Sequence, residues 1–93
     1  MRVTVSFLGV LRDQLGTQSL AFELPAAATY RDLLDSIAPA VEAKAADWAW
    51  DSEKRSFSRQ MMVSRNLSVD VRDEATTLAD GDEIIVVPPL AGG

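Results

Sequence analysis

The chain has 93 residues, enough for one small domain, and its 47% hydrophobic and 25% charged residues are typical of a globular protein. It contains no cysteine and no histidine, which excludes thiol nucleophiles, disulfides, zinc fingers and an imidazole base. The sequence has no membrane-length apolar run, no signal-peptide pattern and no glycine-rich phosphate loop. We therefore expect a cytoplasmic protein, without membrane contact, that is not a self-sufficient enzyme.

The net charge of −5 is unevenly distributed along the chain. Residues 1–65 carry equal numbers of basic and acidic side chains, whereas residues 66–93 carry one basic residue, Arg72, and a series of acidic ones. Repulsion by phosphate makes nucleic acid a poor partner for this protein. The acidic excess is close in sequence to the C-terminal end, where it serves either solubility or steering toward a basic surface. Its members are Asp70, Asp73, Glu74, Asp80, Asp82 and Glu83.

The first quarter of the chain predicts two strands and the connection between them. Apolar and polar residues alternate over residues 1–8, which predicts a half-buried strand. Residues 9–16 have near-helical apolar spacing and end on Gly16, so we expect a turn of helix or an ordered loop there. Alternation returns over residues 19–24. These two strands are predicted to pair antiparallel.

A helix is predicted to begin after Thr29. Thr29 is a good N-cap, and Asp32 three residues later favours the positive end of a helix. Because proline removes a backbone donor, Pro39 predicts a break or kink near Ala38. The expected buried face consists of Leu33, Leu34, Ile37 and Val41.

The stretch over residues 40–59 has no clear period. It contains Trp48 and Trp50, two residues apart, followed by a charged run. The two tryptophans are expected to cover the edge of the core, with a partner-binding patch as the alternative.

The second half of the chain predicts the remaining strands. A third strand begins at residues 61–63, a turn over residues 78–82 uses Gly81, and residues 83–87 form an apolar strand expected at the sheet centre beside the first. This order predicts an α+β class and a single β-grasp (ubiquitin-like) domain, with a mixed sheet of about four to five strands and one main helix. A short fourth alternation is expected at Leu67, Val69 and Val71.

The chain ends in two prolines, two linking residues and a diglycine. We expect a β-grasp domain over residues 1–88 and a flexible, extended tail over residues 89–93, because proline bars further sheet or helix. Such a tail reaches roughly 17 Å at about 3.4 Å per residue. A diglycine has no side chains, so it can thread a narrow passage in another protein's active site. The residues of this ending are Pro88, Pro89, Leu90, Ala91, Gly92 and Gly93.

Three stretches resemble the MoaD/ThiS family of ubiquitin-like sulfur carriers, most closely molybdopterin synthase small subunits. Residues 5–16, VSFLGVLRDQLG, are similar to the family's first strand and following loop. Residues 28–34, ATYRDLL, are similar to its helix start. Residues 78–93, LADGDEIIVVPPLAGG, are similar to its last strand and diglycine ending, although Val87 stands where the family commonly has an aromatic residue.

The resemblance implies a function for the tail. A ubiquitin-activating-type adenylyltransferase would use ATP to adenylate Gly93, and persulfide sulfur would then convert it to a thiocarboxylate. The thiocarboxylate would be delivered to a sulfur acceptor, such as the molybdopterin synthase large subunit. Gly93 is then the reacting residue, and residues 88–92 contact the partners. The chain itself would bind no cofactor or metal, and would act as the small subunit of that synthase without an active site of its own.

Other functions fit the same ending. The carrier could serve thiamine, cysteine or tRNA thiolation instead. A protein modifier would join Gly93 to lysines of its targets, and Lys44 and Lys54 are the lysines available for self-conjugation. A plain β-grasp binding module with an inert tail is a third class, which the terminal diglycine disfavours.

Overall fold

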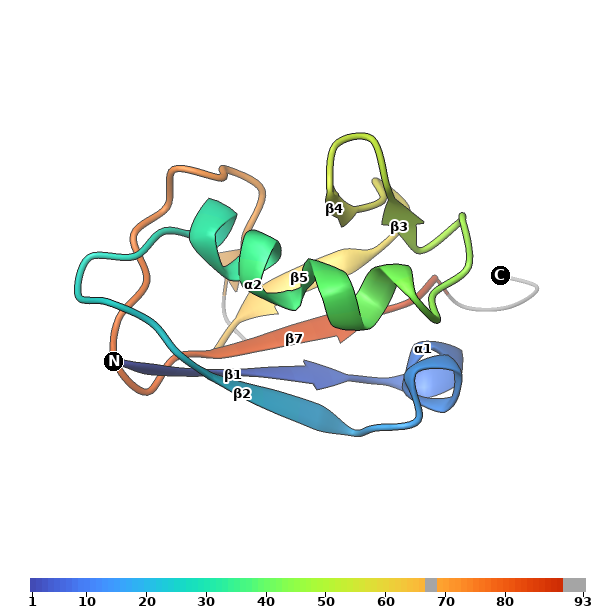
Figure 1. Ribbon diagram of the computed structural model, residues 1–93, viewed down its shortest axis with the longest axis horizontal. Coiled ribbons are helices and arrows are strands. Elements are labelled where there is room, and N and C mark those ends of the chain that lie inside the picture. The colour runs from blue at the N-terminus through green and yellow to red at the C-terminus, as the bar shows by residue number, and fades with distance from the viewer. Residues whose placement is uncertain (67–68, 90–93) are drawn as a thin grey trace.

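In the computed structural model, which describes residues 1–66 and 69–89, the chain folds into two helices and two sheets (Figure 1). The elements in chain order are β1 (Arg2–Phe7), α1 (Gly9–Leu15), β2 (Ser19–Glu23), α2 (Tyr30–Glu42), β3 (Trp50–Asp51), β4 (Ser56–Phe57), β5 (Met62–Arg65), β6 (Val69–Asp70) and β7 (Glu83–Val87).

The main sheet has five strands in the order β2-β1-β7-β5-β6. Its central pair, β1 and β7, is parallel, while β2 pairs antiparallel with β1 and β5 pairs antiparallel with β7. Ile84, Ile85 and Val86 of β7 are all buried, as expected of a strand with neighbours on both sides. The predicted single β-grasp domain of class α+β is confirmed, including the central last strand beside the first. Leu67, from the predicted fourth alternation, lies outside the described residues.

Helix α2 crosses one face of this sheet and leaves the other face open (Figure 1). It buries its apolar stripe against the inward side chains of the strands, which alternate with outward ones because successive strand residues point to opposite faces. Val5 of β1 and Ile84 of β7 are opposite each other in register and fully buried. The buried stripe of the helix includes Leu33, Leu34, Ile37 and Val41, as predicted.

The predicted start of α2 is confirmed, and of the predicted break or kink near Ala38 the break is wrong. Thr29 Oγ1 accepts a hydrogen bond from the Asp32 backbone N–H, and Thr29 N–H donates to the Asp32 carboxylate at 2.9 Å, which completes a capping box. The helix then continues through Pro39 to Glu42. Pro39 and Asp35, whose carbonyl loses its helical donor, are both exposed. Water can solvate that carbonyl, so the missing bond leaves no buried polar group unsatisfied.

Helix α1 forms the connection predicted as a turn of helix. It ends at Gly16, whose φ of 71° lies in the left-handed region and whose N–H donates to Arg12 O at 3.0 Å. Leu11 and Leu15 are buried and join α1 to the core. The predicted turn before the last strand is also present, with Gly81 at φ 86°.

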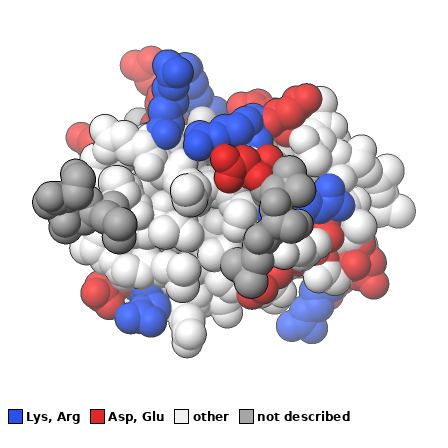
Figure 2. All heavy atoms as spheres, turned by 180° about the vertical axis from the view of Figure 1, so that it is seen from behind, with Lys and Arg blue, Asp and Glu red and all other residues white. Residues whose placement is uncertain are grey.

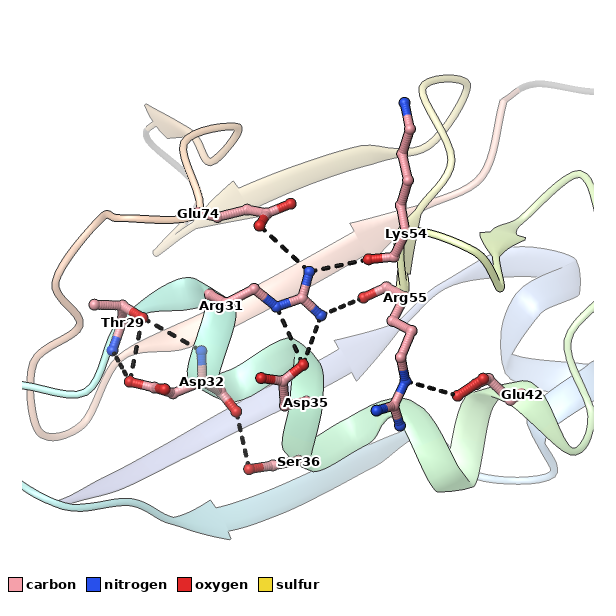
Figure 3. Close-up of polar contacts among 9 residues, drawn as sticks. All are labelled: Thr29, Arg31, Asp32, Asp35, Ser36, Glu42, Lys54, Arg55 and Glu74. Atoms are coloured by element: carbon pink, nitrogen blue, oxygen red, sulfur yellow. Dashed lines mark hydrogen bonds and ion pairs between the residues drawn. The ribbon is translucent and has the colours of Figure 1, made fainter.

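Residues 43–59 include the short β3–β4 hairpin, which the sequence left without a defined structure. Trp50 is buried and meets Phe57 edge to face at 5.1 Å, while Trp48 is partly buried against the core. The tryptophans therefore cover the core edge, as expected. Arg31 fixes the hairpin turn to α2, since its guanidinium donates to the carbonyls of Lys54 and Arg55 (Figure 3).

Candidate functional site

The root of the C-terminal tail is the part of the predicted site that the structure describes. Pro88 and Pro89 are described, whereas Leu90, Ala91, Gly92 and Gly93 lie outside the described residues. The expected roles of those four residues, and the boundary expected after residue 88, stay predictions. In the described part of the chain, neither helix is long and apolar enough to cross a membrane. The same part contains no acidic cluster arranged to hold a metal ion.

Strand β7 positions this root. Val86 is fully buried, and its carbonyl accepts a hydrogen bond from Leu8 N–H at 3.1 Å. Val87 is paired in register with Met62 of β5, one residue before the prolines. Because β7 is central and hydrogen-bonded to β1 and β5, the chain is held firmly up to its last strand residue.

Pro88 continues this attachment beyond the sheet by packing on Gly9. Pro88 is buried and Pro89 is exposed. Gly9 has a φ of 60°, and a Cβ at this position would lie 3.2 Å from Pro88 Cγ. Gly9 is thus needed both for its left-handed backbone and for the close approach of the proline. The exposed root begins at Pro89. Sequence reasoning assigned no role to Gly9, although it stands within the first stretch of the family resemblance.

Exposed apolar side chains surround the root. Leu8, Val10 and Met62 are 41%, 49% and 55% exposed, and they come from the end of β1, from α1 and from the start of β5. The open face of the sheet is largely uncharged in its middle, with charged side chains toward its margins (Figure 2). Exposed apolar groups gathered beside an uncharged sheet face are typical of a protein-binding surface.

The opposite end of β7 carries a buried carboxylate. Asp82 is 6% exposed, and it forms an ion pair with Arg65 at 2.8 Å. It also accepts hydrogen bonds from Asn66 Nδ2 at 3.1 Å and from Ala79 N–H at 2.8 Å. Burial works to raise the pKa of Asp82, but these hydrogen bonds and the Arg65 charge outweigh it and hold the pKa below its ordinary value. Asp82 therefore joins the end of β5 to the turn before β7.

The acidic residues at the start of β7 do not lie beside the tail, as their place in the sequence suggested, and their steering of a basic partner stays a prediction. Asp80, Asp82 and Glu83 lie at the start of β7, whereas the tail leaves from its end, roughly 13 Å further at about 3.3 Å per residue. Asp82 is buried, and Asp80 and Glu83 accept hydrogen bonds from Arg2 N–H and Ser6 Oγ at 2.7 and 3.0 Å. Closeness in sequence did not amount to closeness in space, because a strand separates the two groups.

Comparison with known proteins assigns the fold and the tail to a family. A model described as the ThiS family matches residues 5–93. The chain belongs to the ThiS family. Small archaeal modifier protein 3 of Haloferax volcanii is 29% identical over 93 residues, the full length of both chains. The crystal structure of SAMP1 from Haloferax volcanii has a TM-score of 0.79 at 22% identity and also covers both chains fully. This likeness confirms the β-grasp fold.

Two further similar structures contain a second protein. One is the complex of subunits 1 and 2 of the molybdopterin-converting factor from Helicobacter pylori, with a TM-score of 0.62 at 22% identity over all of both chains. The other is the BexX/CysO complex from Amycolatopsis orientalis, with a TM-score of 0.64 at 28% identity over 98% of this chain and 99% of that one. The chain thus belongs to a ubiquitin-like class that includes ThiS/MoaD-type sulfur carriers and small archaeal modifiers, and similar proteins in it assemble with partners.

Proposed function

We propose that this ThiS-family protein is a sulfur carrier whose Gly93 is adenylated and converted to a thiocarboxylate, and which donates sulfur in molybdopterin synthesis. The observation that carries the proposal is the family match, which runs through the diglycine to residue 93. The geometry of the root supports it, because the fold holds the chain through Pro88 and exposes it from Pro89. Everything beyond Pro89 can then enter another protein's active site.

The chemistry needs partners and no catalytic side chain of the carrier. A carboxylate is a poor electrophile, so its oxygen first attacks the α-phosphorus of ATP on an activating enzyme and pyrophosphate leaves. A persulfide sulfur of that enzyme system then displaces AMP from the acyl carbon. A thiol cleaves the resulting acyl disulfide, which leaves the thiocarboxylate. The absence of cysteine and histidine from the carrier is compatible with this scheme.

Two partners follow from the proposal, and one surface can receive each of them in turn. The activating adenylyltransferase and the acceptor, a molybdopterin synthase large subunit, both need the tail to enter their active sites. The apolar side chains at Leu8, Val10 and Met62 lie around the point where the tail begins. A partner that docks on these side chains would orient the tail toward its active site, even before the tail itself makes contacts inside that site. Similar proteins form complexes with a second protein, which supports docking on a partner.

A second candidate is protein modification, in which Gly93 forms an isopeptide bond with a lysine of a target. The full-length identity of 29% to a small archaeal modifier favours it. Both functions share the adenylated intermediate and differ in the nucleophile, which is persulfide sulfur in one and a lysine amine in the other. Lys44 and Lys54 are exposed, so both are available for self-conjugation.

Mass spectrometry of the protein from its own host distinguishes the two. Exchange of one oxygen for sulfur raises the intact mass of the 10.1 kDa chain by about 16 Da. Conjugation instead leaves a remnant on target lysines. No lysine or arginine follows Arg72, so trypsin would leave residues 73–93 attached. A variant with Ala91→Arg shortens that remnant to Gly-Gly. Finding neither product would contradict both functions.

A further inference from the structure

A cavity of about 330 Å³ lies on the side of the main sheet that α2 covers, opposite the open face of the sheet. It is bounded by α2, the β3–β4 hairpin and residues 71–74. Its apolar lining includes Leu34, Val63 and Phe57. Its rim carries three cations, Lys54, Arg59 and Arg72, all of them exposed. This volume is near the lower end of the range for ligand sites in proteins, about 300 to 1,000 Å³.

The cations at this cavity are uncommitted. Among the residues that the structure describes, ion pairs engage Arg31, Arg55 and Arg65. Among the described residues, none of the three rim cations forms an ion pair. The chain has nine basic residues, so six remain outside these ion pairs, and three of the six line this one cavity. In a chain of net charge −5, such a concentration of free positive charge favours an anionic ligand at this place.

Tyr30 supplies an unpartnered polar group in the cavity wall. It is 5% exposed and lines the cavity, yet its hydroxyl has no hydrogen bond to any described residue. Burial raises the pKa of Tyr30 well above its ordinary value, and the nearby charge of Arg72 acts against that rise. The phenol is therefore neutral at physiological pH, and its O–H can donate to a ligand oxygen.

The cavity is poorly suited to a phosphate group. The first N–H groups of α2, which could cradle a phosphate, are taken: Tyr30 N–H donates to Thr76 O and Arg31 N–H to Glu74 O, both at 2.9 Å. The lining also includes the carboxylates of Asp51 and Glu74, which would repel a dianion. Arg31 neutralises Glu74 at 3.3 Å (Figure 3). Singly charged carboxylates spread along an extended chain meet less repulsion here.

We propose that this cavity binds an acidic peptide segment of a partner protein. Carboxylates of the segment would contact Lys54, Arg59 and Arg72, and an apolar side chain between them would enter the cavity over Leu34 and Phe57. The site faces away from the open sheet surface, so this partner can bind while the tail is engaged elsewhere. The proposal is independent of the chemistry at Gly93.

Titration of the ¹⁵N-labelled full chain with an acetylated Glu-Leu-Glu-Leu-Glu peptide tests this. We expect amide signals of residues 56–59 and 71–74 to shift and saturate. The double variant Arg59→Ala/Arg72→Ala should weaken binding at least about tenfold, whereas Arg2→Ala/Arg12→Ala, which removes the same charge from exposed positions outside the cavity, should weaken it by less than about twofold. Tyr30→Phe should weaken it about threefold, through one lost hydrogen bond.

Several outcomes would overturn the proposal. Equal losses in the two double variants would mean that net charge alone attracts the peptide. Undiminished binding of the Gln-Leu-Gln-Leu-Gln counterpart would exclude carboxylate recognition. Displacement of the peptide by inorganic phosphate or AMP would identify a small phosphate pocket instead. Shifts that stay linear up to about 10 mM peptide would indicate that no site exists.

Discussion

The two ends of β7 differ in chemistry and in exposure. At its start, Asp82 is buried in an ion pair and two further hydrogen bonds, which join β5 to the preceding turn. At its end, Val87 lies beside the exposed Met62, and Pro88 packs on Gly9 without any polar contact. One strand therefore has an electrostatic attachment at one end and an apolar attachment at the other.

Over the five residues of β7, the start of the strand contributes to stability and its end contributes to partner binding. The polar end holds a buried carboxylate that is fully engaged within the protein, so its contribution is to the fold. The apolar end is surrounded by exposed side chains and leads directly into the tail. Changes at the start of β7 should therefore alter unfolding, and changes beyond its end should alter activation and transfer.

Removing Gly93 should produce the largest effect on function and the smallest on the fold. We expect no detectable adenylation or thiocarboxylate, because the reacting carboxylate is displaced by one residue, with a melting temperature unchanged within about 1 °C. Pyrophosphate exchange with the activating enzyme and thermal melting measure the two. Binding of the acidic peptide at the cavity beside α2 should be unaffected by this deletion. A failure of the carrier mechanism can therefore be told apart from a failure of the peptide-site proposal. Full activity of the shortened chain would refute the carrier mechanism.

Asp82→Ala should have the reverse effect, with a loss of stability of about 3 kcal/mol, because it removes the carboxylate that pairs with Arg65 and accepts the part-buried Ala79 N–H. The Asp82 pKa is lowered in the folded state from an ordinary value of 3.8. Its contribution is therefore present above pH 3.8 and is lost as pH falls through the lower, folded pKa. Urea unfolding of both proteins should show a gap that is full at pH 7 and narrows below pH 3.8. Asp70→Ala, an exposed control of equal charge, should cost less than about 0.5 kcal/mol.

Most of the fold could be predicted because its signals are local. Val3, Val5 and Phe7 alternate within one strand, and Thr29 and Asp32 are three residues apart in one turn. The β3–β4 hairpin could not be predicted, because its two strands have two residues each and its turn is held by Arg31, more than 20 residues away in sequence. The helix passes Pro39 because the exposed carbonyl of Asp35 can be hydrated, and exposure is a property of the folded chain.

The candidate site also has one part that the local sequence predicts and another part that it does not. The prolines and the diglycine lie within six consecutive residues, so the sequence alone predicts a tail, and the last four of these residues lie outside the described part of the chain. The contact of Gly9 with Pro88 joins residues from opposite ends of the chain, and only the parallel pairing of β1 and β7 brings them together. Asp80, Asp82 and Glu83 were placed too close to the root for a related reason, since the length of β7 separates them from it.

Gly9→Ala tests the apolar end of β7 directly. The left-handed φ of 60° costs an alanine about 1 kcal/mol, and contact of its Cβ with Pro88 at 3.2 Å adds about 1 kcal/mol more. Gly16→Ala is a matched control, because its φ is 71° and nothing lies within 4 Å of the added Cβ. We expect Gly9→Ala to cost more than Gly16→Ala in urea unfolding and, unlike it, to slow adenylation. Equal costs would show that Pro88 does not constrain this position.

Met62→Glu should have little effect on the fold and a selective effect on partners. Met62 is 55% exposed beside the root, so a charge there should leave stability within about 0.5 kcal/mol. An activating enzyme that docks on the apolar surface would have to desolvate that charge, and we expect affinity to fall about tenfold, or about 1.4 kcal/mol. Ala40→Glu adds the same charge on the exposed side of α2 and should leave this affinity unchanged. Equal effects of the two substitutions would mean that the partner responds to net charge, and that the apolar end of β7 is not its docking surface.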